Sequence, residues 1–124
     1  MATVVTNAGL DILTNRIKGS GTEPNYVAWG TGAGTAAVGD TTLFTESAES
    51  RTSGTSSRQT TNTTNDTYRV IGTITASAGR AITNAGLFDA ASTGNLFVKG
   101  DFSTVNLLTG ESIQFTIDTV FDQA

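Results

Sequence analysis

The chain contains no cysteine and no histidine among its 124 residues. Without cysteine, neither a disulfide framework nor a thiolate metal site is possible. Without histidine, the commonest general base and the commonest zinc ligand are missing, so most hydrolytic and metal-assisted mechanisms lose their first-choice residue. The patterns of a nucleophile elbow, a Walker loop and a calcium loop do not occur either. We therefore expect no enzymatic activity, no catalytic residues, no cofactor and no bound metal.

Long apolar segments are also lacking, and proline occurs once, at Pro24. No apolar run approaches the length of a membrane span, and the N-terminus has neither the basic start nor the apolar core of a signal peptide. We expect no membrane association and no export. Abundant threonine and 14 glycines suit a strand-rich fold with glycine turns. At this length, a single domain over residues 1–124 is expected.

Positive charge is scarce in the last third of the chain. The formal net charge is −4, and residues 89–124 hold five acids against Lys99 alone, whereas residues 1–88 hold six acids and six bases. Proteins that bind nucleic acid normally carry a basic excess or a basic stripe. The charge distribution therefore argues against nucleic acid as a direct partner.

One segment, residues 6–18, has the pattern of an α-helix. Thr6 is a suitable N-cap, and Gly19 can adopt the left-handed conformation that ends a helix. Gly9 inside the segment is tolerable if the helix packs closely on a sheet. Three apolar side chains recur at helical spacing and are predicted to form the buried face: Leu10, Leu13 and Ile17.

The strongest strand pattern lies within residues 81–119, which are expected to supply core strands. Near its end, Ile113, Phe115 and Ile117 alternate with polar residues, which is the period of a strand with one buried face. Shorter strand patterns cover residues 26–29 and 68–76. The predicted fold is mainly β: a small antiparallel β-sandwich of about seven or eight strands with one N-terminal α-helix.

Residues 49–65 contain no apolar side chain. We name them the polar segment and predict an edge strand or arm that enters the next strand through a turn at residues 65–66. An exposed strand edge has free backbone groups that another chain can use. Its arginines are either solvated charges or contacts with an acidic partner or with the acidic C-terminal third of a neighbouring copy. The candidate interface residues are Arg51, Arg58, Gln59, Asn62 and Trp29.

Four stretches of the chain carry a family resemblance: ITNAGLFD (82–89), LFVKGDF (96–102), GESIQFTI (110–117) and YVAWGTG (26–32). Together they resemble a widespread class of small structural proteins of tailed bacteriophages. Members include head decoration (cement) proteins and tail-fibre or collar modules. Asn84 stands where this class usually has an acid.

The resemblance implies a virion protein that is assembled in the host cytoplasm. The first expectation is a capsid decoration protein that binds the outer shell and stabilises it, with the major capsid protein and copies of itself, as a homotrimer, for partners. The alternative is a tail or neck fibre or adaptor subunit. A third hypothesis is a carbohydrate-binding sandwich, for which Trp29 and Tyr26 are the candidate aromatic residues.

Overall fold

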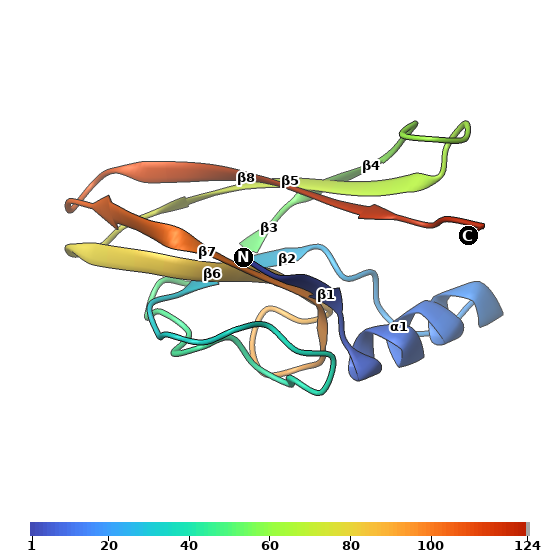
Figure 1. Ribbon diagram of the computed structural model, residues 1–124, viewed down its shortest axis with the longest axis horizontal. Coiled ribbons are helices and arrows are strands. Elements are labelled where there is room, and N and C mark those ends of the chain that lie inside the picture. The colour runs from blue at the N-terminus through green and yellow to red at the C-terminus, as the bar shows by residue number, and fades with distance from the viewer. Residues whose placement is uncertain (124) are drawn as a thin grey trace.

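The computed structural model describes residues 1–123 and consists of two stacked antiparallel sheets with one helix near the N-terminus (Figure 1). This confirms the predicted fold class. Within the described residues, no helix has the length and apolar character needed to cross a membrane. The elements are β1 (Thr3–Val5), α1 (Asn7–Lys18), β2 (Tyr26–Gly30), β3 (Thr52–Ser53), β4 (Thr55–Gln59), β5 (Thr67–Thr75), β6 (Arg80–Phe88), β7 (Leu96–Leu107) and β8 (Ser112–Val120).

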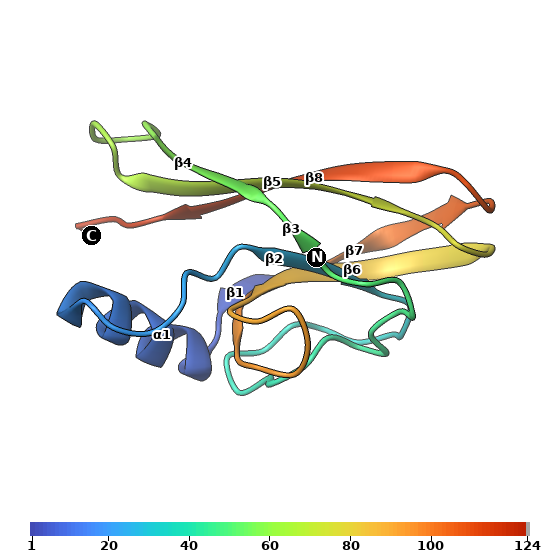
Figure 2. The same ribbon diagram turned by 180° about the vertical axis from the view of Figure 1, so that it is seen from behind.

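The two sheets differ in size. The larger has the strand order β1-β7-β6-β2-β3, and the smaller has the order β4-β5-β8. Figure 2 shows the smaller sheet lying over the larger one, with α1 beyond one end of the larger sheet. Every strand pair is antiparallel, as short connections allow.

The larger of the two hydrophobic core clusters lies between the sheets. The ring of Trp29 from β2 meets the ring of Phe115 from β8 edge-on, with 6.3 Å between the ring centroids. Ile82 from β6 and Val70 from β5 are fully buried. These side chains come from alternating positions on facing strands, so the period-two pattern of the sequence becomes the contact between the two layers.

Helix α1 begins and ends where the sequence predicts. The side chain of Thr6 accepts a hydrogen bond from the Gly9 N–H at 2.9 Å, and Gly19 has a φ of 90°. A Cβ atom at Gly9 would collide with the carbonyl oxygen of Phe97 in β7. Glycine therefore allows the helix to lie directly against the sheet.

The predicted buried face of this helix was wrong for two of its three residues. Leu10 and Ile17 are 56% and 80% exposed, whereas Ile12 is 4% exposed and belongs to the core. Leu13 is partly buried. The reason is Gly9: its side of the helix makes the closest approach to β7, which turns Leu10 and Ile17 outward.

The polar segment crosses from one sheet to the other at Gly54. Before it, β3 pairs with β2 in the larger sheet, and after it, β4 pairs with β5 in the smaller sheet. A Cβ atom at Gly54 would approach the Cγ1 of Val70 to 2.5 Å. A glycine is therefore needed where the chain passes close to the core between the layers.

Candidate functional site

The five predicted interface residues fall into three environments. Trp29 is 1% exposed, so it is a core residue and its ring is not part of the surface. Arg51 is nearly covered by the rest of the chain. Arg58 and Gln59 lie on β4, and Asn62 lies in the turn that follows. The structure therefore brings three of the five together.

Glu49, the first residue of the polar segment, accepts a cluster of hydrogen bonds. One carboxylate oxygen accepts from the indole N–H of Trp29 at 3.0 Å and from the Ser47 hydroxyl. The other accepts from the Ser77 N–H at 3.0 Å and from the Arg80 Nε at 2.8 Å. Burial alone would raise the pKa of Glu49, but these hydrogen bonds outweigh it and hold the pKa well below its usual range. The cluster fastens the start of the polar segment to β2 and β6.

Arg51 uses its donors within the chain, which corrects the interpretation of this residue as a solvated or partner-binding charge. Its guanidinium forms a two-point ion pair with Glu46, with N–O distances of 2.8 and 3.0 Å. The same group donates to the carbonyl oxygens of Ala90 and Thr93 and lies 3.5 Å above the Phe88 ring. Its side chain is only 6% exposed. Arg51 therefore fastens the polar segment to the loop between β6 and β7.

Residues 55–66, which we name the hairpin arm, comprise β4 and the turn that follows. Its tip extends beyond the rest of the smaller sheet (Figure 1). The Asp66 carboxylate accepts three backbone hydrogen bonds in this turn, from Thr61 at 2.9 Å, Asn62 at 2.9 Å and Thr63 at 2.8 Å. These bonds, led by the one from Thr63, hold the pKa of Asp66 well below its usual range. The turn therefore has a defined shape despite its polar composition.

Arg58 is the exposed cation of the hairpin arm. It lies opposite Tyr68 in the pairing of β4 with β5. Within residues 1–123 its guanidinium has no hydrogen bond and no ion pair. This contrasts with Arg51, Arg69, Arg80 and Lys99, each of which is paired with a carboxylate.

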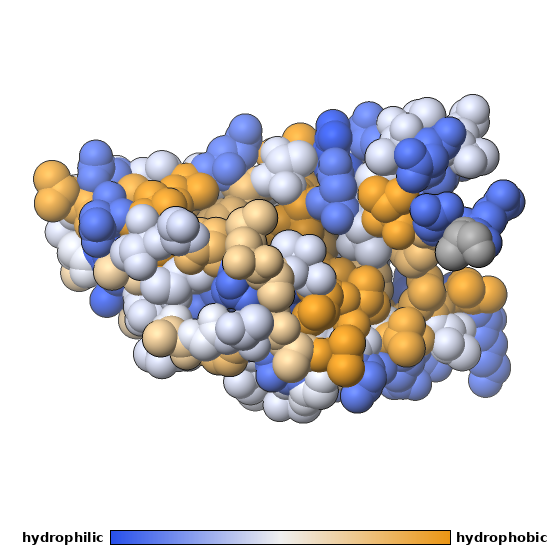
Figure 3. Space-filling model, viewed as in Figure 1, coloured by the Kyte–Doolittle hydropathy of each residue, from blue (hydrophilic) through white to orange (hydrophobic). Residues whose placement is uncertain are grey.

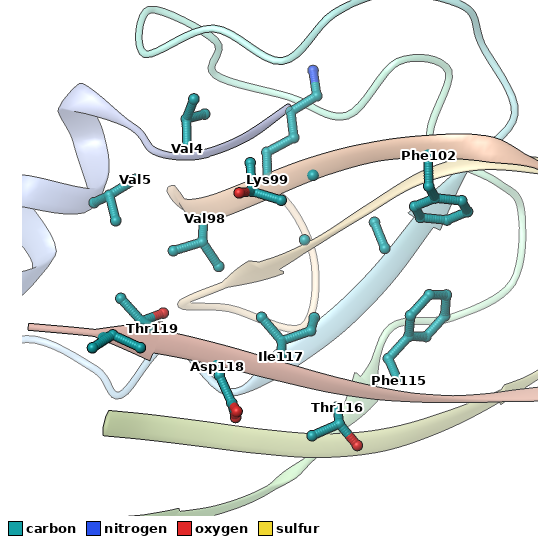
Figure 4. A pocket seen from close by; sticks show the side chains of 15 residues that line it. Val4, Val5, Val98, Lys99, Phe102, Phe115, Thr116, Ile117, Asp118 and Thr119 are labelled. Carbon is teal, nitrogen blue, oxygen red and sulfur yellow. The ribbon is translucent and has the colours of Figure 1, made fainter. Parts of the chain in front are cut away.

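A groove of about 430 Å³ opens between the edges of the two sheets, with β1 and β7 on one side and β8 on the other. Phe102 and Phe115 point toward each other across it, with 6.4 Å between their ring centroids (Figure 4). Val98 and Ile117 also line it. Apolar surface is visible between the sheets on this side of the molecule (Figure 3). We name this the open groove.

Lys99 is a buried cation whose burial the sequence does not predict. Its side chain is 1% exposed, and its ammonium lies 3.0 Å from the Asp40 carboxylate and 3.2 Å from the centroid of the Phe44 ring. The ammonium also donates to the Thr42 carbonyl oxygen at 2.9 Å. A hydrogen bond from the Ala37 N–H, followed by the one from Lys99, lowers the pKa of Asp40. The signal in the sequence was a lysine directly after three apolar residues, Leu96–Val98.

Asn84, the departure from the phage pattern, has a structural role. It is fully buried on β6. Its side-chain oxygen accepts from the Phe44 N–H at 3.0 Å, and its side-chain nitrogen donates to the Phe44 carbonyl oxygen at 3.1 Å. An amide satisfies both backbone groups of Phe44, whereas a carboxylate could only accept. Within residues 1–123, no group of three acidic side chains is placed to hold a metal ion.

A family model matches residues 1–121, nearly the whole chain, and shows that it is a structural protein of the bacteriophage virion. The family is described as podophage GP4 fiber I protein gp80, and the chain belongs to this family. The match supports the fibre alternative better than capsid decoration. No curated protein and no solved structure matches the chain.

Proposed function

We propose that this chain is a non-catalytic structural subunit of a podophage fibre, mounted on the tail or neck of the particle. The observation that carries the proposal is the match of residues 1–121 to a family of fibre proteins. The subunit contributes contacts with neighbouring virion proteins rather than chemistry. Its position is therefore in the virion, among proteins of the tail or neck.

The hairpin arm is the surface that we assign to such contacts. It combines a fixed turn, organised by Asp66, with exposed polar side chains at Arg58 and Asn62. A rigid arm loses little conformational entropy when it binds. The unpaired guanidinium of Arg58 favours a neighbour that presents a carboxylate, because opposite charges guide association and set its specificity.

Imaging of the intact particle by electron cryomicroscopy tests the proposal. We expect few copies of the chain per particle, in density attached to the tail or neck. A shell covered by many copies would contradict the fibre role and would support capsid decoration instead. Quantitative mass spectrometry of purified particles gives the copy number independently of the image.

A second measurement tests the surface. In particles, the hairpin arm should lie against a neighbouring protein, with the Arg58 guanidinium within ion-pair distance of a carboxylate. An arm that projects into solvent in every copy would exclude it as the attachment surface, whatever the location of the chain in the particle.

A further inference from the structure

The four outer strands of the two sheets differ in how well they are protected against pairing with a strand of another chain. Three of them are short: β1 has 3 residues, β3 has 2 and β4 has 5. The fourth, β8, runs for 9 residues at the edge of the smaller sheet. Proteins usually shorten, charge, bulge or cover such an edge, because its free backbone groups can pair with another strand.

Strand β8 lacks most of these protections. Residues 112–120 contain no proline, lysine or arginine. Their pairing with β5 runs from Ser112 to Val120 without a register shift, so no bulge interrupts it. The single charge, Asp118, is already paired with Arg69 at 2.8 Å. The free side of β8 is therefore a regular template for another strand.

The side chains of β8 also remain incompletely covered. Ile113, Phe115 and Ile117 face the larger sheet but are only partly buried. Thr116 and Asp118 point to the opposite, outer face, away from the open groove (Figure 4). An added strand would therefore need apolar residues on one face and polar residues on the other. The sequence of β8 itself has this alternation.

We propose that β8 pairs in antiparallel orientation with β8 of a second copy, with Thr116 on the two-fold axis. This register pairs all nine residues. It places Phe115 opposite Ile117 of the second copy and Thr116 opposite its own equivalent. Aromatic–β-branched and Thr–Thr pairs are both favourable across strands. The interface is isologous, which is the commonest form of association between identical subunits.

Charge supports the same register. Asp118 lies opposite Gln114 of the second copy, whose side-chain amide can donate to the carboxylate. The two Asp118 carboxylates do not face each other, because they lie on opposite sides of the axis. The self-complementary sequence favours a second copy over an unrelated strand, since the same nine residues supply both halves of every pair.

The resulting dimer has one continuous sheet with three strands from each copy. Its outer face is polar, and its inner face continues the apolar lining of the open groove. The two hairpin arms, carried by the strands most distant from the axis, remain free for other contacts. This inference goes beyond the proposed function and does not depend on whether the chain is located at the tail or on the shell.

Single-cysteine variants test the register, because the chain has no cysteine of its own. Opposite residues of an antiparallel pair lie about 4.5–5.5 Å apart, within disulfide range. Thr116→Cys should form a linked dimer under mild oxidation. In the matched control Gln114→Cys, the two sulfurs belong to strand positions about 13 Å apart and should not link. Equal linking of both variants, or linking of neither, would overturn the proposed register.

Charge at the axis tests the interface by a second route. Thr116→Lys places two like charges opposite each other and should raise the dissociation constant of the dimer at least about tenfold in sedimentation equilibrium. An equal mixture of Thr116→Lys and Thr116→Glu should recover association. A wild-type chain that stays monomeric at all concentrations would overturn the proposal. So would a dimer whose dissociation constant does not change with these substitutions. A cross-link from Thr116→Cys to a different virion protein would also overturn it.

Discussion

Arg51 and Arg58 lie in the same polar segment and have opposite environments. Arg51 is covered, paired with Glu46 and bonded to two carbonyl oxygens of the loop between β6 and β7. Arg58 is exposed and unpaired within residues 1–123. The polar segment is therefore divided at Gly54, where the chain changes sheets: the part before it is framework and the part after it is available surface.

The difference shows that an absence of apolar residues does not make a segment a surface arm. A charged residue can be covered when its partners satisfy it, as Glu49 and Arg51 are satisfied by neighbours from other parts of the chain. Within residues 1–123, the side chains of the hairpin arm form hydrogen bonds only with the arm itself and with β5. The following predictions test this division, beginning with the largest expected effect.

Removal of the Glu49 carboxylate should have the largest effect on stability. Glu49→Ala leaves the Trp29 N–H and the Arg80 guanidinium without their acceptor, so we expect a loss of about 3 kcal/mol in the free energy of unfolding. Urea denaturation measures this loss. The matched control is Asp11→Ala on the exposed face of α1, which should change stability by less than about 0.5 kcal/mol. Equal effects of the two variants would contradict the framework role.

The helix offers the same contrast between covered and free side chains. Ile12→Ala removes a core side chain and should cost about 2 kcal/mol, at the low end for such a change because the helix lies at one end of the core. Leu10→Ala, on the exposed face, should cost less than about 0.5 kcal/mol. The two urea midpoints give the comparison directly. A larger loss from the Leu10 variant would mean that the helix packs through its other face.

A fall in pH should lower the free energy of unfolding in part because the Glu49 carboxylate becomes protonated. A carboxylate whose folded pKa is lowered stabilises the protein above its ordinary pKa of 4.5, and this contribution is lost as the pH falls toward the folded pKa. We expect the urea midpoint of the wild type to decrease below about pH 4.5. Glu49→Gln should be less stable near neutral pH and should show a shallower decrease. The remaining slope comes from the other carboxylates whose pKa values are lowered: Asp40, Asp66, Asp101 and Asp118. Parallel pH profiles would contradict this assignment.

Loss of the Asp66 carboxylate should act locally. Asp66→Ala removes the acceptor shared by the N–H groups of Thr61, Asn62 and Thr63, so hydrogen exchange at these three amides should accelerate more than exchange at the amides of the core strands. Asn62→Ala, which keeps the carboxylate, is the control and should leave their exchange unchanged. Unchanged exchange in the Asp66 variant would show that the shape of the turn does not depend on this side chain.

Local features of the fold could be predicted from the sequence. The caps of α1 depend on Thr6 and Gly19 themselves, and the inward face of β8 follows from the alternation of Ile113 and Phe115. Each of these signals acts within a few residues of its effect. The helix face could not be predicted correctly, because it depends on the approach of Gly9 to β7, far along the chain.

The positions of the candidate interface residues could be predicted only in part, because some of them depend on contacts with distant parts of the chain. Arg58, Gln59 and Asn62 lie on an exposed edge and turn, as their polar surroundings indicated. The partners of Arg51 include two backbone carbonyl groups from the loop between β6 and β7. Every residue has such a group, so residue types do not reveal these partners. Burial of Trp29 depends on its packing against Phe115 of the other sheet, and short strand patterns do not reveal how the two sheets stack.

The most direct test compares Arg51→Glu with Arg58→Glu. Each chain is purified for thermal unfolding and is also supplied to a phage that lacks the wild-type gene, so that its incorporation into particles can be counted. We predict that Arg58→Glu keeps the wild-type unfolding midpoint but is poorly incorporated, because an exposed charge contributes little to folding and much to recognition. Arg51→Glu should lower the midpoint clearly. Normal incorporation of Arg58→Glu, or an unchanged midpoint for Arg51→Glu, would contradict the division of the polar segment into framework and surface.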